Sequence, residues 1–558
     1  DLHSFPTRRS SDLVGEAHSE IMAPRESAQA AKTTATIARS AGAVSIAVMC
    51  SRLLGLVREQ VFAGLFGAGL AYDAFVVAFR IPNLLRDLFG EGALSAAFVT
   101  VFSEYNTNKS QQETWRLASN VLVFFAVFVS GLTLIALLCA EPIVHLLAPD
   151  FQLVAGKTEL TATLTRIMLP FLLFVSLSAV VMGMLNTKGK FFVPALSSSF
   201  FNLGSIVGGL TLAWLLPRFG LPAIVGMAWA TLLGGALQLL IQVPTLGKTG
   251  FRFHFVFAPR DSGLRRILLL MLPATIGLSA TQLNIFINTN FAASCGQGAV
   301  SWLNYAFRLV QLPIGVFGVA LSIAIMPVLA REAAERDLNS LKQTFTSSLV
   351  LVLALALPAT AGLVLLAEPI IRLIFEHGAF TATDTQATAQ ALCWYSVGLF
   401  AYAANKVMVP VFYATGNTRY PVIGSFLGVA ANLAVINLVI ATMGHRGIAF
   451  STSCAMMLNF VFLSVVLYRK LHGYPLWHLV KGLGKILCAS GLMLAVTWGM
   501  RQLLAPWLAG MLLQQILAIA AIVLVAVLSY GSLLQLLRLP EYTLITKKFR
   551  QRFARRPS

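Results

Sequence analysis

The segment SRLLGLVREQVFAGLFGAGLAYDAFVVAFRIPNLLRDLFGEGALS, residues 51–95, joins two apolar stretches that both contain charged residues. These residues are Arg52, Arg58, Glu59, Asp73, Arg80, Arg86, Asp87 and Glu91. A charge at the centre of a bilayer costs roughly 2.5–3.5 kcal/mol. We therefore expect the cluster to face a wet cavity or to pair internally, and the excess of arginine indicates an anionic ligand.

The rest of the chain is very apolar. Of its 558 residues 57% are hydrophobic and only 11% are charged, whereas soluble domains carry about 25% charged residues. A helical span needs about 20 apolar residues. Fourteen such stretches begin near residues 42, 70, 117, 162, 193, 222, 268, 299, 344, 387, 421, 447, 483 and 511. The composition predicts an all-α integral membrane protein with 14 transmembrane helices.

The net charge of +19 is distributed in a way that indicates membrane topology, not nucleic-acid binding. Loops after even-numbered spans are basic, and loops after odd-numbered spans are nearly free of lysine and arginine. By the positive-inside rule both termini are expected in the cytoplasm. An even number of spans agrees with this topology.

An internal repeat with a period of about 227 residues organises the chain. Ala78-Phe79-Arg80 recurs as Ala306-Phe307-Arg308, and Ala140-Glu141-Pro142-Ile143 recurs as Ala367-Glu368-Pro369-Ile370. The period covers six spans, so both copies have the same orientation, as in transporters whose substrate site lies between parallel repeats. We expect two six-helix lobes, and two C-terminal helices outside the repeat.

These patterns give six segments. They are a polar N-terminal extension (1–39), an N-lobe with spans 1–6 (40–246), a basic cytoplasmic loop (247–267), a C-lobe with spans 7–12 (268–470), spans 13–14 (471–537) and a basic cytoplasmic tail (538–558). The extension has no secretory signal pattern. Because Met22 opens a natural-looking cytoplasmic start, we interpret residues 1–21 as non-native sequence.

Cations from different spans are expected to converge between the lobes. Arg308 lies in the eighth span at the repeat position of Arg80, and Lys406 lies in the tenth. Guanidinium groups are suited to bidentate binding of phosphate. The alternative is that these residues snorkel or form structural ion pairs with Asp73, Glu91 and Glu59, and for Arg80 the candidate partner is Asp73. Asp73 and Glu91 are expected to hold or balance the arginines.

Signatures of catalysis are missing. The sequence has no phosphate-binding loop, no His-Glu-x-x-His motif and no cluster of loop acids for a metal. We therefore expect a transporter without catalytic residues, metal or cofactor. A coupling ion, the membrane potential or the substrate gradient would drive it.

The ordered motifs resemble those of the MurJ (MviN) family of bacterial lipid II flippases. The resemblance is carried by SRLLGLVRE (51–59), by residues 66–98, and by SWLNYAFRLVQLPIGVFGVALSIAIMP (301–327). It extends from about residue 40 to the C-terminal region. The chain departs from the family pattern at two positions. It has Gln311 where some relatives have a glutamate, and Asp87 where relatives often have a second basic residue.

The resemblance implies a member of the multidrug/oligosaccharidyl-lipid/polysaccharide exporter superfamily with a central cationic cavity and alternating access. It implies transport of lipid II, an undecaprenyl-diphosphate-linked disaccharide-pentapeptide, from the cytoplasmic to the periplasmic leaflet of the bacterial inner membrane. The substrate-binding arginines would be Arg52, Arg58, Arg86 and Arg308. Asp73, Arg80, Glu91 and Lys406 would have supporting or gating roles, and spans 13–14 would form a groove for the lipid tail.

Partners and alternatives follow from the same resemblance. The expected partners are lipid II and the bilayer, with cell-wall synthesis proteins as candidates, no nucleic acid, and a monomeric state. The main alternative is a flippase for another polyprenyl-linked oligosaccharide. A drug exporter would need an aromatic or acidic cavity, a membrane transferase would need clustered acids or histidines, and a scaffold would have no use for intramembrane charges.

Overall fold

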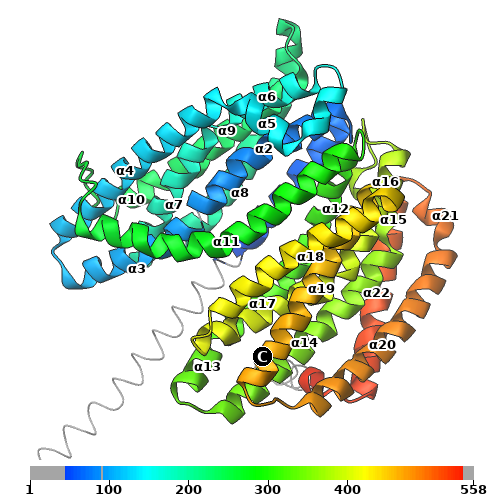
Figure 1. Ribbon diagram of the computed structural model, residues 1–558. Coiled ribbons are helices and arrows are strands. Elements are labelled where there is room, and N and C mark those ends of the chain that lie inside the picture. The colour runs from blue at the N-terminus through cyan, green and yellow to red at the C-terminus, as the bar shows by residue number, and fades with distance from the viewer. Residues whose placement is uncertain (1–43, 45, 90–91, 544–558) are drawn as a thin grey trace, which may run out of the picture.

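The computed structural model describes residues 44, 46–89 and 92–543, and these residues form helices and connecting loops without a strand. The predicted N-terminal extension, most of the predicted C-terminal tail, and Glu91 lie outside the described residues. Two diverging groups of helices make up the molecule (Figure 1).

The first lobe contains a helix at residues 46–66 and the helices that follow it up to residue 247. These are α2 (Leu70–Phe89), α3 (Ala93–Asn108), α4 (Gln111–Leu138), α5 (Ala140–Leu147), α6 (Lys157–Met168), α7 (Phe171–Thr187), α8 (Phe192–Leu215), α9 (Ala223–Leu240) and α10 (Val243–Gly247), with 3₁₀ turns at Pro149–Leu153 (η1) and Leu216–Phe219 (η2).

The long helix α11 (Ser262–Ser294) links the lobes and packs on α2 and α3 of the first lobe and on α12 and α18 of the second. The second lobe and the C-terminal helices follow it. They are α12 (Ala299–Pro313), the π-helix η3 (Ile314–Val319), α13 (Ala320–Ala334), α14 (Leu338–Leu365), α15 (Ala367–Phe375), α16 (Ala382–Val397), α17 (Leu399–Ala414), α18 (Arg419–Met443), α19 (His445–Lys470), α20 (Leu476–Leu503), α21 (Ala505–Leu508) and α22 (Leu512–Leu536).

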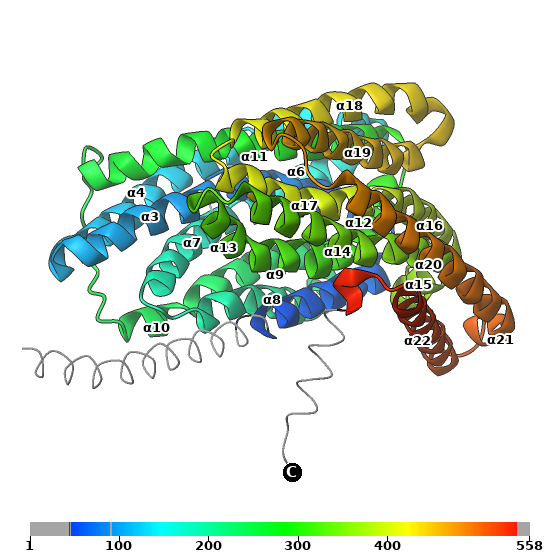
Figure 2. The ribbon, with the colours of Figure 1, turned by 90° about the horizontal axis from the view of Figure 1, so that it is seen from below.

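The internal repeat is visible in the packing of the helices. In the first lobe α2 packs on α6, α5 on α6, α4 and α3 on α7, and α8 on α9. The second lobe repeats each pair, as α12 on α16, α15 on α16, α14 and α13 on α17, and α18 on α19. Beyond the repeat, α20 packs on α14 and on α22 along the outer side of the second lobe (Figures 1 and 2). The predicted plan of two repeated lobes plus two extra C-terminal helices is confirmed.

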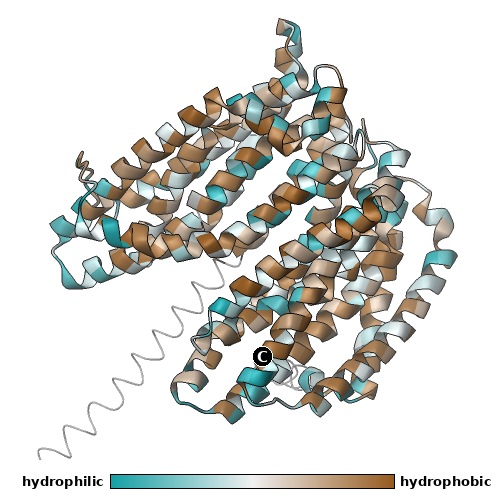
Figure 3. Ribbon diagram, in the orientation of Figure 1, coloured by the Kyte–Doolittle hydropathy of each residue, from teal (hydrophilic) through white to brown (hydrophobic). Residues whose placement is uncertain are grey.

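Eleven helices in the described residues are long and apolar enough to cross a bilayer, and the pair α16–α17, bent by 42°, raises the number to twelve. Apolar residues extend along most of the helices, and polar residues gather at many of their ends (Figure 3). The other two predicted spans are the helix at 46–66 and α2, in which charged residues interrupt the apolar sequence. The total of fourteen spans stays a prediction.

The lobes touch at one end, where the turn before α2 meets the turn before α16. The amide of Ala379 donates to the carbonyl of Gly64 at 2.9 Å. Gly67 has a φ of +60°, and a side chain there would collide with the carbonyl of Ala379. We call this region, residues 64–69 and 377–380 with the start of α12, the closed end. Only glycine combines the left-handed backbone with so close an approach.

Sequence signals at helix ends explain where several helices begin. Ser110 and Glu113 form a capping box at the start of α4, because the Ser110 hydroxyl accepts from the Glu113 amide and the Glu113 carboxylate accepts from the Ser110 amide. Thr381 and Asp384 do the same at the start of α16. These caps satisfy backbone N–H groups that have no partner inside the helix.

Candidate functional site

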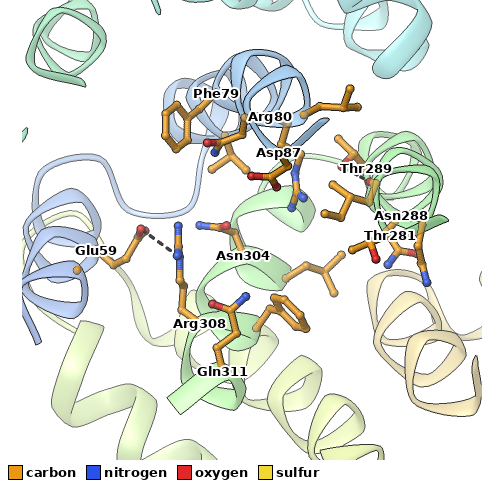
Figure 4. A pocket seen from close by; sticks show the side chains of 18 of the residues that line it. Glu59, Phe79, Arg80, Asp87, Thr281, Asn288, Thr289, Asn304, Arg308 and Gln311 are labelled. Atoms are coloured by element: carbon orange, nitrogen blue, oxygen red, sulfur yellow. Dashed lines mark hydrogen bonds and ion pairs between the residues drawn. The ribbon is translucent and has the colours of Figure 1, made fainter. Parts of the chain in front are cut away.

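A cavity of about 770 Å³ lies between the lobes, lined by side chains from both and from α11. Figure 4 shows one part of it, with Arg80 and Asp87 from α2, Asn304, Arg308 and Gln311 from α12, and Thr281, Asn288 and Thr289 from α11. The contact between the lobes at the closed end separates this cavity from that side of the molecule.

The charges on the cavity wall are strongly unbalanced. Six cations and two acids line it, a net charge of +4, and they are Arg52, Arg58, Arg80, Arg86, Arg308, Lys406, Glu59 and Asp87. All the arginines singled out from the sequence, and Lys406, are therefore at one cavity. In a low-dielectric surrounding, such an excess of positive charge attracts anions strongly.

Glu59 connects the cations of the two lobes. Its Oε1 lies 3.3 Å from Nε of Arg308 (Figure 4). The same oxygen accepts from Nη2 of Arg58 at 2.8 Å, and Oε2 accepts from the Tyr72 hydroxyl at 2.6 Å. The Glu59 side chain is only 3% exposed. The sequence analysis considered Glu59 as part of the charged cluster and as a structural ion-pair partner of the arginines, but not as a residue of the site. Its position inside an apolar helix, directly after an arginine, was the available signal for a larger role.

Arg58 is almost buried between the helices of the first lobe. Its guanidinium lies 5.4 Å from the ring centroid of Phe201 and 5.8 Å from that of Phe62. A cation over an aromatic face is stabilised by the ring quadrupole. These rings and Glu59 hold the guanidinium in place without covering it completely.

Arg52 reaches across to the second lobe. Its guanidinium occupies the place where a side chain on Gly315 would stand. Gly315 lies in η3, the single π-helical stretch of the described helices. This stretch begins directly after Pro313. The sequence analysis did not assign Gly315 to the site. The structure shows that its missing side chain makes room for Arg52.

Arg80 does not pair with Asp73, which corrects the alternative considered from the sequence. The two residues are seven positions apart on α2, which separates their backbones by roughly 10 Å, and the Asp73 carboxylate has other partners. No carboxylate within the described residues lies within ion-pair distance of Arg80, and its Nε is buried without a hydrogen-bond partner. A guanidinium in this situation is a strong candidate for binding an anionic ligand.

Asp73 joins the lobes at the closed end instead of lining the cavity. Its carboxylate accepts from Lys157 Nζ at 3.0 Å, from the amides of Gly298 and Ser301 at 2.8 and 3.0 Å, and from the Ser301 hydroxyl at 2.6 Å. Asp73 is fully buried. Its hydrogen bonds to the amides of Gly298 and Ser301 cap the N-terminus of α12 from the opposite lobe. An acid near a helix N-terminus is favoured by the helix dipole. The sequence analysis did not predict the buried partner of Asp73, Lys157, because a lysine before an apolar span looks like an ordinary loop lysine.

Arg86 is partly neutralised, as the sequence departure at Asp87 suggested. Nη2 and Nε of Arg86 donate to Oδ1 of Asp87 at 2.9 and 3.1 Å, and Gln282 of α11 donates to the other carboxylate oxygen at 3.1 Å. Glu91, the remaining predicted supporting acid, lies outside the described residues.

Another group of cavity residues is polar but uncharged. Four asparagines line the cavity, Asn284 and Asn288 on α11, Asn405 on α17 and Asn459 on α19, and we call them the amide wall. Within the described residues, no group of three or more His, Cys, Asp or Glu side chains is placed to hold a metal ion. The cavity thus offers both guanidinium groups and amides, an arrangement suited to binding a large polar anion.

Comparison with known families agrees with this geometry. The family model described as "Lipid II flippase MurJ" matches residues 62–518. A probable lipid II flippase MurJ of Vibrio cholerae is 34% identical over 507 residues, which cover 88% of this chain and 95% of the relative. The lipid II flippase MurJ of Burkholderia cenocepacia is 34% identical over 459 residues, 81% of this chain and 88% of that protein.

Solved structures show the same architecture. A lipid II flippase MurJ in an inward closed conformation superposes with a TM-score of 0.73 and 28% identity, covering 88% of this chain and 98% of that one. An inward-facing multidrug transporter of the MATE family shares the fold, with a TM-score of 0.65 at 17% identity over 76% of this chain and 94% of that one. From the match of the family model and the extent of the related sequences, the chain belongs to the lipid II flippase MurJ family.

Proposed function

We propose that the protein moves lipid II, the undecaprenyl-diphosphate-linked disaccharide-pentapeptide, from the cytoplasmic to the periplasmic leaflet of the bacterial inner membrane. The observation that carries the proposal is the cavity with a net charge of +4 between two lobes of a membrane protein. A diphosphate that leaves the headgroup region loses its water, and guanidinium groups replace that water with fixed charge-assisted hydrogen bonds.

The ion-pair partners of the cations indicate which of them can bind the diphosphate first. Arg52, Arg80 and Lys406 have no carboxylate within ion-pair distance among the described residues, so they are available to the diphosphate from the start. Arg58 and Arg308 share Glu59. When the diphosphate arrives, Arg308, whose side chain is 39% exposed, turns from Glu59 to the ligand.

Alternating access supplies the movement. The contacts of Asp73 with Gly298 and Ser301, and of Gly64 with Ala379, hold the closed end. Rocking of the lobes breaks these contacts and opens the cavity on the other side. By the positive-inside pattern the closed end faces the periplasm and both termini face the cytoplasm.

The prenyl tail stays outside the polar cavity, because each methylene group moved from lipid to water costs about 0.8 kcal/mol. Exposed apolar side chains on α20 and α22 offer it a path, among them Leu487, Leu492, Val496, Leu524 and Val527. Energy comes from the membrane potential, about 2.3 kcal/mol per charge per 100 mV, or from a coupling ion. The protein acts as a monomer, with cell-wall synthesis proteins as candidate partners.

Complementation tests the proposal. The resident lipid II flippase of a test bacterium is depleted, the full chain is expressed, and lipid II on the outer leaflet is measured. Restored exposure by the wild type, but not by Arg58→Ala or Arg308→Ala present at equal membrane levels, is the expected result. A well-expressed wild-type protein that leaves lipid II inside, yet replaces a flippase for another polyprenyl-linked oligosaccharide, would reassign the substrate.

A further inference from the structure

The two halves of the repeat present different chemistry to the same cavity. The helix at 46–66 opens the first lobe and contributes Arg52, Arg58 and Glu59 to the wall. The helix α11, the seventh span, begins the second half of the repeat as the helix at 46–66 begins the first. The side chains of α11 that line the cavity include no charged residue. Amides and hydroxyls in a membrane span are disfavoured by lipid, and so their position on the cavity side calls for a polar ligand.

The amide wall is held in place by its own hydrogen bonds. Asn432 of α18 donates from Nδ2 to Oδ1 of Asn284 at 2.9 Å and to Oδ1 of Asn288 at 2.8 Å. Asn288 in turn donates to the Thr452 hydroxyl at 3.0 Å, and Asn405 donates to the carbonyl of Met456 at 3.3 Å. These bonds tie α11, α18 and α19 together and fix the direction of the amides before any ligand arrives.

Several polar atoms of the wall remain unused. Within the described residues Nδ2 of Asn284 makes no hydrogen bond, and neither does the amide of Asn459. The oxygens of Asn405 and Asn459 are buried without a partner, and that of Asn459 lies beside Gly424 of α18, whereas the unpaired Nδ2 atoms of Asn284 and Asn459 are not buried. Buried polar groups are normally paired. The unpaired Nδ2 groups at the cavity therefore indicate a ligand that accepts hydrogen bonds, and sugar hydroxyls and acetamido carbonyls do so.

The charge of the surroundings limits the ligand further. The wall contains no carboxylate, and the cation of Lys406 follows Asn405 directly on α17. A metal cation would be repelled by Lys406 and would lack an anionic ligand. The amides themselves carry no charge, and neutral groups with hydroxyls and amides match them.

We propose that the amide wall binds the sugar portion of the carried glycolipid, through its hydroxyl and acetamido groups, while the arginines bind the diphosphate. This inference rests on the proposed function and assigns the two parts of one head group to different groups of cavity residues. A site built to hydrogen-bond a substrate group discriminates against an analogue without it, because its own polar groups are then left unpaired.

The test compares two lipids that share the diphosphate. The full chain in nanodiscs is titrated with lipid II and with undecaprenyl diphosphate, which has no sugar. For Asn459→Ala we expect about five-fold weaker binding of lipid II, the value of one hydrogen bond, and unchanged binding of undecaprenyl diphosphate. Asn405→Ala/Asn459→Ala should increase the loss. Asn437→Ala, on the exposed outer side of α18, is the matched control and should bind both lipids as the wild type does.

A second variant protects the test against misfolding. Asn284→Asp keeps the oxygen that accepts from Asn432 and replaces only the unused Nδ2, so α11 and α18 remain joined. It should lower the affinity for lipid II more than that for undecaprenyl diphosphate. If the wall variants weaken both lipids equally, or neither, the assignment of the sugar to this wall is wrong. If the wild type binds neither lipid, the proposed function itself fails.

Discussion

Glu59 and Arg308 meet across the cavity, with 3.3 Å between Oε1 and Nε, and so one buried acid of the first lobe holds a cation of the second. Glu59 also neutralises Arg58. The pair links the charge state of the cavity to the relative position of the lobes. A diphosphate that takes Arg308 from Glu59 loosens this link, which gives the ligand a direct effect on the conformation.

Glu59→Gln should destabilise the protein and tighten the binding of the diphosphate. The substitution keeps an acceptor for Tyr72 but leaves Arg58, whose side chain is 8% exposed, without its counter-charge. Breaking a buried ion pair costs on the order of 3 kcal/mol. We expect a lower thermal unfolding midpoint, a several-fold higher affinity for undecaprenyl diphosphate and slower transport. Glu141→Gln, which removes an exposed pair with Arg166, should change none of these quantities. An unchanged midpoint for Glu59→Gln would contradict the role given to the acid.

Gly315→Ala should lower transport, because the new methyl group takes the place of the Arg52 guanidinium and forces this flexible side chain to move. The matched control is Gly362→Ala in α14, where nothing lies within 4 Å of the added carbon. The thermal unfolding midpoint of Gly315→Ala should stay near that of the wild type, because the Arg52 side chain can move. In the double variant Arg52→Ala/Gly315→Ala, transport should be no lower than in Arg52→Ala alone. Thermal unfolding and lipid II exposure in cells measure the two effects. Equal behaviour of the two glycine variants would show that the Arg52–Gly315 contact is unimportant.

Arg80→Ala should weaken the binding of undecaprenyl diphosphate by about 10- to 100-fold, the range expected for losing a hydrogen bond to a charged group. The folded protein should be as stable as the wild type or more so, because Arg80 has no carboxylate partner among the described residues and has a buried, unpartnered Nε. Arg80→Lys keeps the charge and should lose less affinity. Binding titrations and thermal unfolding on the same samples test both statements. Lower stability with full affinity would assign Arg80 a structural role.

Asp73→Asn should open the closed end. Lys157, 2% exposed, would lose its counter-charge, and α12 would lose the anionic cap at Gly298 and Ser301. Removing one partner of a buried pair costs about 3–5 kcal/mol. We expect faster labelling of a cysteine placed at Ala68 by a membrane-impermeant maleimide. Adding Lys157→Met should slow the labelling again, since it removes the unpaired cation. Asp150→Asn, in η1, is the control and should label like the wild type.

The sequence by itself determined the class of the protein and its repeated plan. Membrane spans are visible because lipid demands a long apolar run, and charges that interrupt such a run are visible for the same reason. The repeat placed Arg80 and Arg308 at equivalent positions, and the structure puts both at the cavity. Helix starts such as Ser110-x-x-Glu113 depend only on residues close together in the chain, and so the sequence alone can predict them.

Only the tertiary structure decided which charges meet. Asp73 pairs with Lys157, 84 residues away, and caps a helix 225 residues away, while Arg80 on the same helix has no acid partner in the described residues. Two other contacts also join distant segments. Arg52 lies in the space left by the missing side chain of Gly315. Asn432 of α18 donates a hydrogen bond to Asn284 of α11. Such pairings depend on how the lobes pack against each other. The hydrophobic periodicity of a span records that it is buried, but not which side chain of another span it will touch.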